Sequence, residues 1–249
     1  MDVFVRVFLS LVTILLLGAC GSLVDTGDSS ASPDGSATTI MPLGASRVEG
    51  NRPEFESFRY ELWKRLVENG WDFDFVGTRA DEAEYAEFGG FSFDVDHQGT
   101  SGWTSGQILE ELGGWLSETG APDVVLLSSP GGNDALEGLP FDEAVANVTA
   151  VINRIQEANP NVTIVVEQMA PAATEVMTGD LAGFIEQMQR EVLVIANDQT
   201  TDSSRVIAVD MFTGFGDDLL ADDVHYNERG AMFIADKYYA VLEDVLASE

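Results

Sequence analysis

Short apolar runs alternate with amphipathic stretches along residues 38–249. Five runs that are mostly apolar predict strands, at 38–43, 73–77, 124–128, 162–167 and 206–209. Several of them are apolar at nearly every position, which is typical of strands covered on both faces. Apolar residues that recur every three or four positions predict helices over 55–66, 108–116, 145–155, 181–192 and, after the candidate N-cap Asn227, 233–242.

This alternation predicts the fold class. Strands that alternate with helices form right-handed crossovers, which place the strands parallel to one another. We therefore expect an α/β protein, a three-layer α/β/α sandwich around a doubly wound, five-stranded parallel sheet. In such folds ligands bind beyond the carboxyl ends of the strands, so the residues that follow each strand are the candidates for chemistry.

The N-terminal residues predict export and not a part of the fold. Residues 7–17 are almost entirely apolar and follow Arg6, but a membrane-spanning helix needs about 20 residues. The stretch is typical of a secretory signal peptide, and its end, Leu17-Gly18-Ala19-Cys20, resembles a bacterial lipobox. This resemblance implies a signal peptide at 1–19, a lipid on Cys20, a flexible tether at 20–37 rich in Ser, Gly and Asp, and a domain at 38–249. The expected location is the cell envelope, with the protein anchored to the membrane on its periplasmic or extracellular face; an ordinary secretory signal is the alternative.

Charge excludes some classes of partner. The chain has 43 acidic and 12 basic residues and a formal net charge of -31, which repels phosphate backbones, so no nucleic-acid partner is expected. Only two of the basic residues are lysines, Lys64 and Lys237. An acidic surface with few lysines leads to the hypothesis that the protein is adapted to high salt, as in a halophile. With two histidines far apart and no H-E-x-x-H motif, a metal-dependent hydrolase is not expected, and no cofactor is predicted.

Three groups of polar residues follow predicted strands. Gly44-Ala45-Ser46 follows the first strand, Gly131-Gly132-Asn133-Asp134 follows the third, and Asp222 stands three residues before His225 near the last helix. A carboxylate in that position can hold the Nδ1–H of the imidazole, so that Nε2 is free to take a proton from a serine. The first group is not the G-x-S-x-G elbow of other hydrolases, because Val48 stands where the second glycine belongs.

Four segments together resemble a known family. They are 40–50 (IMPLGASRVEG), 97–108 (HQGTSGWTSGQI), 124–134 (VVLLSSPGGND) and 222–230 (DDVHYNERG). In this order they are similar to the four blocks of the SGNH, or GDSL-type, esterase superfamily, and in particular to its acetylxylan-esterase-like members. The resemblance covers residues 38–249 and implies the flavodoxin-like fold of an SGNH hydrolase.

The resemblance also implies a role for each matching residue. Ser46 would be the nucleophile, His225 the general base and Asp222 the acid that orients it. The backbone N–H groups of Ser46 and Gly102 and the side-chain amide of Asn133 would form the oxyanion hole. Donors held in such a site accelerate acyl transfer by about a hundred- to a thousandfold each.

The chain departs from the family pattern at two positions. Ala45 stands where the family usually has Asp, and Tyr226 stands where Pro commonly follows the histidine. The missing carboxylate is neither nucleophile nor base, so we expect altered loop order or activity more than its loss. It also leaves open a catalytically weak or inactive, surface-displayed carbohydrate-binding domain.

Several residues keep a structural alternative beside the functional one. His225 could cap the last helix, and Asn133 could serve only to form a turn. Trp103 is either a packing residue or a platform for a sugar face. His97 has no serine partner in the motif, which favours a structural role over contact with the substrate. The acidic stretch 81–96 is most simply a solvated surface.

The predicted function is that of a serine esterase. It would remove short acyl groups, acetyl foremost, from carbohydrate, either a small molecule or a polysaccharide, through an acyl-serine intermediate. A lysophospholipase or thioesterase is the nearest alternative among enzymes. Long acyl chains need an extended apolar groove, and the short polar loops HQGTSGW and GGNDALEGLP favour small acyl groups.

Overall fold

The computed structural model describes residues 37–247. Cys20 and the predicted signal peptide lie outside these residues, as does the predicted tether up to residue 36. The strands are β1 (Thr38–Gly44), β2 (Phe73–Phe75), β3 (Arg79–Ala80), β4 (Asp96–Gly99), β5 (Val124–Leu127), β6 (Thr163–Gln168) and β7 (Arg205–Asp210). The helices are α1 (Ser46–Glu49), α2 (Arg59–Glu68), α3 (Ser105–Thr119), α4 (Gly132–Leu136), α5 (Phe141–Ala158), α6 (Gly179–Gln199) and α7 (Glu228–Leu246), with a 3-10 turn η1 (Asp217–Leu219).

One mostly parallel sheet forms the middle layer. Its order is β3-β4-β1-β5-β6-β7, and β2 also pairs with β1. β2 and β4 share one edge of β1: residues 38–40 pair with β2, and Leu43 and Gly44 pair with β4. All five predicted strands are present and parallel, in the order of a flavodoxin-like sheet.

The prediction of five strands, all parallel, is wrong, because the sheet has further strands at one edge. The structure adds β4 and β3, and β3 runs antiparallel to β4. The sequence of β4 is Asp-His-Gln-Gly and that of β3 is Arg-Ala, so neither strand has the apolar pattern from which strands are predicted. β4 is nevertheless largely buried, because α1 packs against it.

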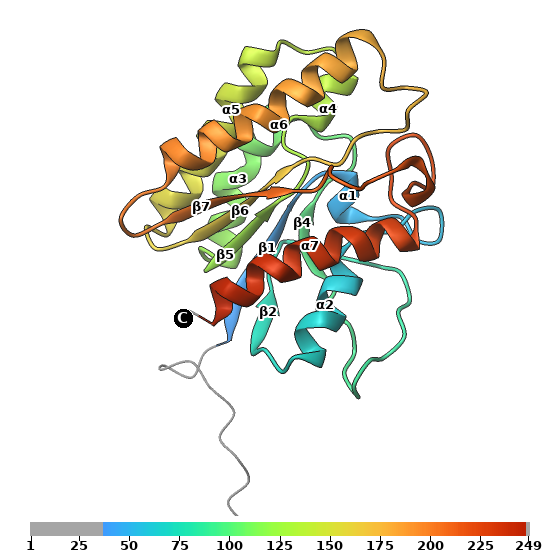
Figure 1. Cartoon of the computed structure of the whole chain (residues 1–249). Coiled ribbons are helices and arrows are strands. Elements are labelled where there is room, and N and C mark those ends of the chain that lie inside the picture. Colours follow the sequence, from blue (N-terminus) through green and yellow to red (C-terminus); the bar gives the residue numbers. More distant parts are fainter. Residues whose placement is uncertain (1–36, 248–249) are drawn as a thin grey trace, which may run out of the picture. The chain divides into compact units, whose positions relative to one another are not determined.

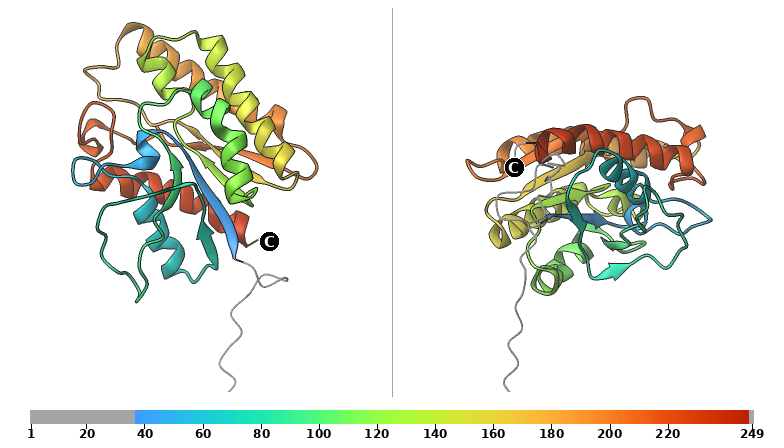
Figure 2. Two further views of the ribbon diagram at one scale, coloured as in Figure 1. Left: turned by 180° about the vertical axis from the view of Figure 1, so that it is seen from behind. Right: turned by 90° about the horizontal axis from the view of Figure 1, so that it is seen from below.

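Helices cover both faces of the sheet, so the predicted three-layer class is confirmed (Figures 1 and 2). Helices α3, α5 and α6 pack on one face, and α2 and α7 pack on the other. Strand β5 serves both layers, since Val125 and Leu127 face the first group of helices and Val124 and Leu126 face the second. No helix among residues 37–247 is long and apolar enough to cross a membrane.

Local sequence explains where two helices begin, and tertiary contacts explain a third. The Asn227 side chain accepts a hydrogen bond from Gly230 N at 3.0 Å and caps α7, as predicted. The predicted helix at 55–66 begins only at Arg59, because isolated bridges hold Phe55 against Asn51 and the next residue against Tyr226 in extended form. Helix α3 begins with a capping box formed by Thr104 and Gln107.

The end of β1 lies at the switch point of the sheet. The chain continues from β1 to β2 and β4 on one side of it and to β5 on the other side, so the loops after β1 and β5 diverge and leave a crevice. Gly44 is required at this end. A Cβ atom there would lie 2.9 Å from Val48 Cγ2 and 3.0 Å from the Ser128 carbonyl oxygen. Its absence lets α1 start directly above the sheet.

Candidate active site

Three side chains that are distant in sequence form a hydrogen-bonded chain at the carboxyl edge of the sheet. Ser46 is the first residue of α1, immediately after β1, and His225 lies in the loop before α7. The Nε2 atom of His225 lies 2.9 Å from Ser46 Oγ, although 179 positions separate the two residues. The Nδ1 atom of the same ring lies 2.7 Å from Asp222 Oδ2. The structure therefore brings together the serine, imidazole and carboxylate that the sequence singled out.

The loop between Asp222 and His225 is held by the same carboxylate. Asp222 Oδ1 accepts the backbone N–H groups of Val224 at 2.8 Å and His225 at 2.7 Å. Partial burial by itself raises the pKa of Asp222, but these hydrogen bonds and the bond from the imidazole hold that pKa below its ordinary value. Asp222 is therefore ionised at neutral pH. It favours the tautomer of His225 that has a proton on Nδ1 and a free Nε2.

Phe55 contacts the imidazole directly, a contact that no pattern in the sequence predicts. The ring centroids of Phe55 and His225 lie 3.8 Å apart with an angle of 13° between the ring planes. The hydrophobic periodicity had placed Phe55 in a helix with Phe58 and Leu62. Its actual position at the open end of the sheet fixes the orientation of the His225 ring from one face.

The three groups expected to donate to an oxyanion belong to Ser46, Gly102 and Asn133, and these residues line one groove. Neither the backbone N–H of Ser46 nor that of Gly102 donates to another group among the described residues. Gly102 has a φ of +78°, a left-handed conformation that favours glycine. Asn133 Nδ2 donates one hydrogen bond to the Trp103 carbonyl oxygen at 2.8 Å. The preceding Ser101 N–H is fixed by Glu49 Oε2 at 2.7 Å.

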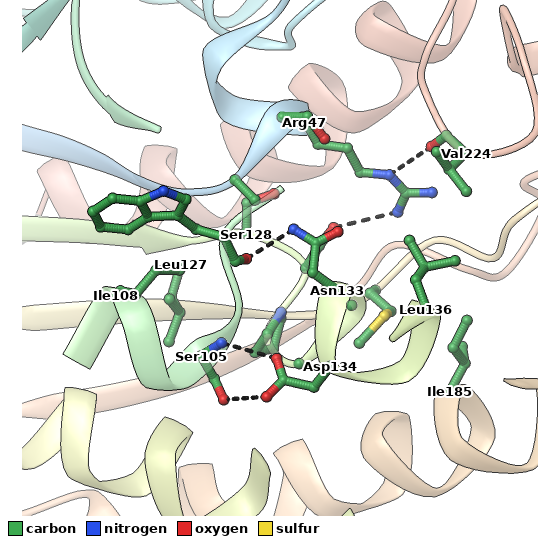
Figure 3. Close-up of a pocket in the computed structure, with 18 of the residues that line it drawn as sticks. Arg47, Ser105, Ile108, Leu127, Ser128, Asn133, Asp134, Leu136, Ile185 and Val224 are labelled. Atoms are coloured by element: carbon green, nitrogen blue, oxygen red, sulfur yellow. Dashed lines mark hydrogen bonds between the residues drawn. The ribbon is translucent and has the colours of Figure 1, made fainter. Parts of the chain in front are cut away.

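The helix that carries Asn133 is tied to the loop that carries Gly102. The Asp134 carboxylate is buried and accepts two hydrogen bonds from Ser105, one from its backbone N–H at 2.8 Å and one from its hydroxyl at 2.7 Å (Figure 3). Ser105 opens α3, three residues after Gly102. The bond from Asn133 to Trp103 joins the same two segments, so the candidate donors are held in one rigid unit.

Two hollows meet at Ser46 and His225. The first is a small cavity of about 70 Å³ behind Asn133, lined by apolar side chains that include Ile108, Leu127 and Ile185 (Figure 3). The second is an open groove of about 1010 Å³ on the other side. Charged and polar residues line much of that groove: Glu49, Asn51, Arg52, Arg79, Asp81 and Glu82.

Trp103 lies beside the small cavity, whereas His97 is buried in the fold. The ring of Trp103 stacks on Trp115, with ring centroids 5.5 Å apart, and lines the small cavity and not the groove. His97 is buried, its Nδ1 accepts the backbone N–H of Gly99 at 3.0 Å, and burial lowers its pKa to about 3. Asp223 is exposed.

The expectation that 81–96 is simply a solvated surface is wrong at Asp81. Its carboxylate lies 2.7 Å from the buried guanidinium of Arg59. Partial burial opposes the charge on Asp81, but bonds from Tyr85, the backbone and Arg59 lower its pKa. This segment is therefore anchored to α2.

Residues 37–247 contain no cluster of three or more His, Cys, Asp or Glu side chains placed to hold a metal ion.

The sheet order, the two helical layers and the residues at the carboxyl edge define a class: a hydrolase with the SGNH fold. The family model described as GDSL-like Lipase/Acylhydrolase family matches residues 70–232, well over half of the chain, and the protein belongs to this family. The matched range includes Asn133, Asp222 and His225 and begins after Ser46. The protein is therefore a carboxylic ester hydrolase.

Solved structures agree with this assignment. An acetyl esterase mutant with acetate ion is 28% identical, with a TM-score of 0.74, over 85% of this chain and 99% of that one. A carbohydrate esterase family 3 protein from Talaromyces cellulolyticus is 27% identical, with a TM-score of 0.73, over 85% and 99% of the two chains. A family 3 carbohydrate esterase from Clostridium thermocellum is 29% identical, with a TM-score of 0.70, over 86% and 98%. A comparison with curated proteins gives no match.

Proposed function

We propose that this protein is a serine esterase that removes short acyl groups, acetyl foremost, from carbohydrate through an acyl-serine intermediate. The observation that carries the proposal is the hydrogen-bonded chain from Ser46 Oγ through the His225 ring to Asp222, at 2.9 and 2.7 Å. Such a chain activates a serine hydroxyl, whose own pKa is far too high for it to attack an ester at neutral pH. The acetyl and carbohydrate esterases with similar structures support the choice of substrate.

The reaction would proceed in two steps. Ser46 Oγ attacks the ester carbonyl while its proton passes to Nε2 of His225, and the charge that develops on the carbonyl oxygen meets the N–H groups of Ser46, Gly102 and Asn133. The intermediate collapses, the alcohol leaves with the proton from His225, and an acyl-serine forms. Water then gives its proton to the same imidazole and attacks the acyl-serine. The new intermediate collapses, the acid leaves, and the proton passes from His225 Nε2 back to Ser46 Oγ.

The size of the small cavity favours a substrate with a short acyl group. One water-sized sphere occupies roughly 10–15 Å³ on this kind of measure, so about 70 Å³ holds a group of a few heavy atoms. A fatty acyl chain would have to displace side chains of α5 and α6 such as Val148 and Ile185, which line this cavity. The groove on the other side of Ser46 is open and lined in part by charged and polar side chains, which can bind a hydroxylated alcohol such as a sugar.

Replacement of the nucleophile is the first test. We expect Ser46→Ala to lose turnover of p-nitrophenyl acetate by at least a factor of about a thousand while its circular dichroism spectrum and melting temperature stay those of the wild type. Ser117→Ala is the matched control and should keep full activity, because Ser117 is an exposed serine on α3 whose hydroxyl donates to Gly113 O. If Ser46→Ala retained the wild-type rate, the assignment would be wrong.

Further measurements separate the alternatives. Rapid labelling of the wild type by a fluorophosphonate probe, absent in Ser46→Ala, is expected for an esterase and would exclude an inactive binding domain.

Asn133→Ala should reduce kcat by about a hundredfold with little change in KM, because the Asn133 amide acts on the transition state. Release of acetate from acetylated xylan should exceed hydrolysis of p-nitrophenyl octanoate or of a lysolipid, which a lysophospholipase or thioesterase would prefer.

We also infer that lipidated Cys20 anchors the protein in the cell envelope. The proposal rests on the Leu-Gly-Ala-Cys segment and the preceding apolar stretch. Expression in a bacterial host with labelled palmitate should give a labelled, membrane-associated protein. Cys20→Ser should abolish the label; a labelled Cys20→Ser protein would exclude this anchor.

A further inference from the structure

Arg47, the residue after the candidate nucleophile, is a buried cation with no direct part in the proposed chemistry. Only 9% of its surface is exposed. Its guanidinium also lies over the ring of Tyr226, 4.8 Å from the centroid. A buried guanidinium is costly unless its N–H groups are used, so the acceptors that it finds show what it holds.

The acceptors of Arg47 come from three separate loops. Arg47 Nε donates to the Val224 carbonyl oxygen at 2.8 Å (Figure 3). Its terminal nitrogens donate to the Ala170 carbonyl oxygen at 2.8 Å, to the Pro171 carbonyl oxygen at 3.1 Å and to Ser129 Oγ at 3.3 Å. Val224 immediately precedes His225. The side chain that begins beside the candidate nucleophile thus reaches the loop that carries its base.

A second buried group completes this junction. Glu167 lies near the end of β6 and is fully buried, and its Oε2 accepts the Ser129 backbone N–H at 2.7 Å and the Ser129 hydroxyl at 3.2 Å. Ser129 has a φ of +47°, the one left-handed non-glycine conformation among residues 37–247. The two bonds to Glu167 hold Ser129 in this conformation. The turn that follows Ser129 leads into α4 and Asn133.

We propose that Arg47 is a positioning residue: it holds the His225 loop in register with Ser46, and the Glu167–Ser129 contact holds the Asn133 turn in the same frame. This inference rests on the proposed function. Arg47 links the backbone of residue 224 to α1, so a shift of Val224 changes the 2.9 Å contact between His225 Nε2 and Ser46 Oγ. Misplacement of a catalytic group by about 1 Å can cost about a hundredfold in rate.

Lysine is the informative substitution, because it keeps the charge and most of the volume but loses the planar fork of donors. For Arg47→Lys we expect kcat on p-nitrophenyl acetate to fall by about ten- to a hundredfold with KM within about twofold. The rate of fluorophosphonate labelling should fall as well, since labelling needs Ser46 to be activated by His225 but needs no release of an acyl group. Arg47→Ala should lose more; if it does not fold, Arg47→Lys alone carries the test.

Ile155→Val is the matched control. Ile155 is fully buried in the core on α5, and its truncation lowers the stability of the fold while leaving every acceptor of Arg47 in place. It should keep the wild-type kcat at a temperature where both variants are folded. Wild-type kcat in Arg47→Lys, a loss confined to KM, or an equal loss of kcat in Ile155→Val would each overturn the inference. Such results leave the proposed function standing if Ser46→Ala is inactive, whereas an active Ser46→Ala overturns the proposed function itself.

Discussion

Replacement of Asp222 by asparagine separates the two tasks that its carboxylate performs. Oδ1 accepts the backbone N–H groups of Val224 and His225, and Oδ2 faces the imidazole Nδ1 at 2.7 Å. In Asp222→Asn the amide oxygen can keep both backbone bonds, so the loop should hold its shape. The amide NH₂ then faces Nδ1, and two donors cannot share that contact.

The imidazole should respond by changing its tautomer. With Nδ1 as acceptor, the proton moves to Nε2, which can no longer take the proton of Ser46. In serine proteases the same replacement lowers kcat by about 10⁴. The Asp222 side chain is 52% exposed here, so solvent already screens its charge and the tautomer is the main effect. We expect a loss of kcat between about 10² and 10⁴, which is roughly 3–5 kcal/mol at about 1.4 kcal/mol per tenfold.

The assay is hydrolysis of p-nitrophenyl acetate, with the melting temperature measured alongside. Asp223→Asn is the matched control, because it removes the same charge from the neighbouring exposed residue and should leave kcat within about twofold. If Asp222→Asn kept more than a tenth of the wild-type kcat, or if Asp223→Asn lost as much, orientation of the imidazole by Asp222 would be refuted.

Three further predictions concern buried or stacked side chains. Burial lowers the pKa of His97 to about 3, so between pH 6.5 and 3 the unfolded chain binds more protons than the folded one. The free energy of unfolding therefore falls as the pH is lowered, by up to about 1.4 kcal/mol per pH unit. Urea unfolding at several pH values should show a weaker pH dependence of this free energy for His97→Asn than for the wild type, and an equal pH dependence would contradict this. Asp134→Ala leaves two donors of Ser105 unpaired and should lower the free energy of unfolding in urea by about 2–4 kcal/mol, a change under 1 counting against it. Phe55→Ala should lower kcat by about tenfold through a less fixed His225 ring, with Phe55→Tyr near the wild type; equal kcat in both variants would show that the stack is irrelevant.

Some features of the site follow from the sequence because their causes are local. Asp222 and His225 share one short loop, so their spacing alone predicts the bond between carboxylate and imidazole. The apolar runs that became β1, β5, β6 and β7 are recognisable because strands covered on both faces are mostly apolar. Asn227 caps α7 through its own near neighbours. Each of these signals depends on residues only a few positions apart.

The parts that could not be predicted depend on contacts between distant residues. β4, with the sequence Asp-His-Gln-Gly, becomes a strand because α1 and β1 cover it. Phe55 fits a helical stripe by its spacing, yet it stacks on a histidine 170 positions away. Nothing in the sequence distinguishes Arg47 and Glu167 from other charged residues, because their hydrogen-bond partners come from distant segments.

The amino-acid order by itself thus determined the class of fold, the order of its main strands and the residue types available for acyl transfer. Only the tertiary structure decided which other side chains surround these residues at the carboxyl edge of the sheet, such as Phe55, and which are buried to hold them there, such as Arg47 and Glu167. The physical reason is that hydrophobic periodicity records how each segment faces the core, whereas the partner of a hydrogen bond is chosen by chain segments that approach from far along the sequence.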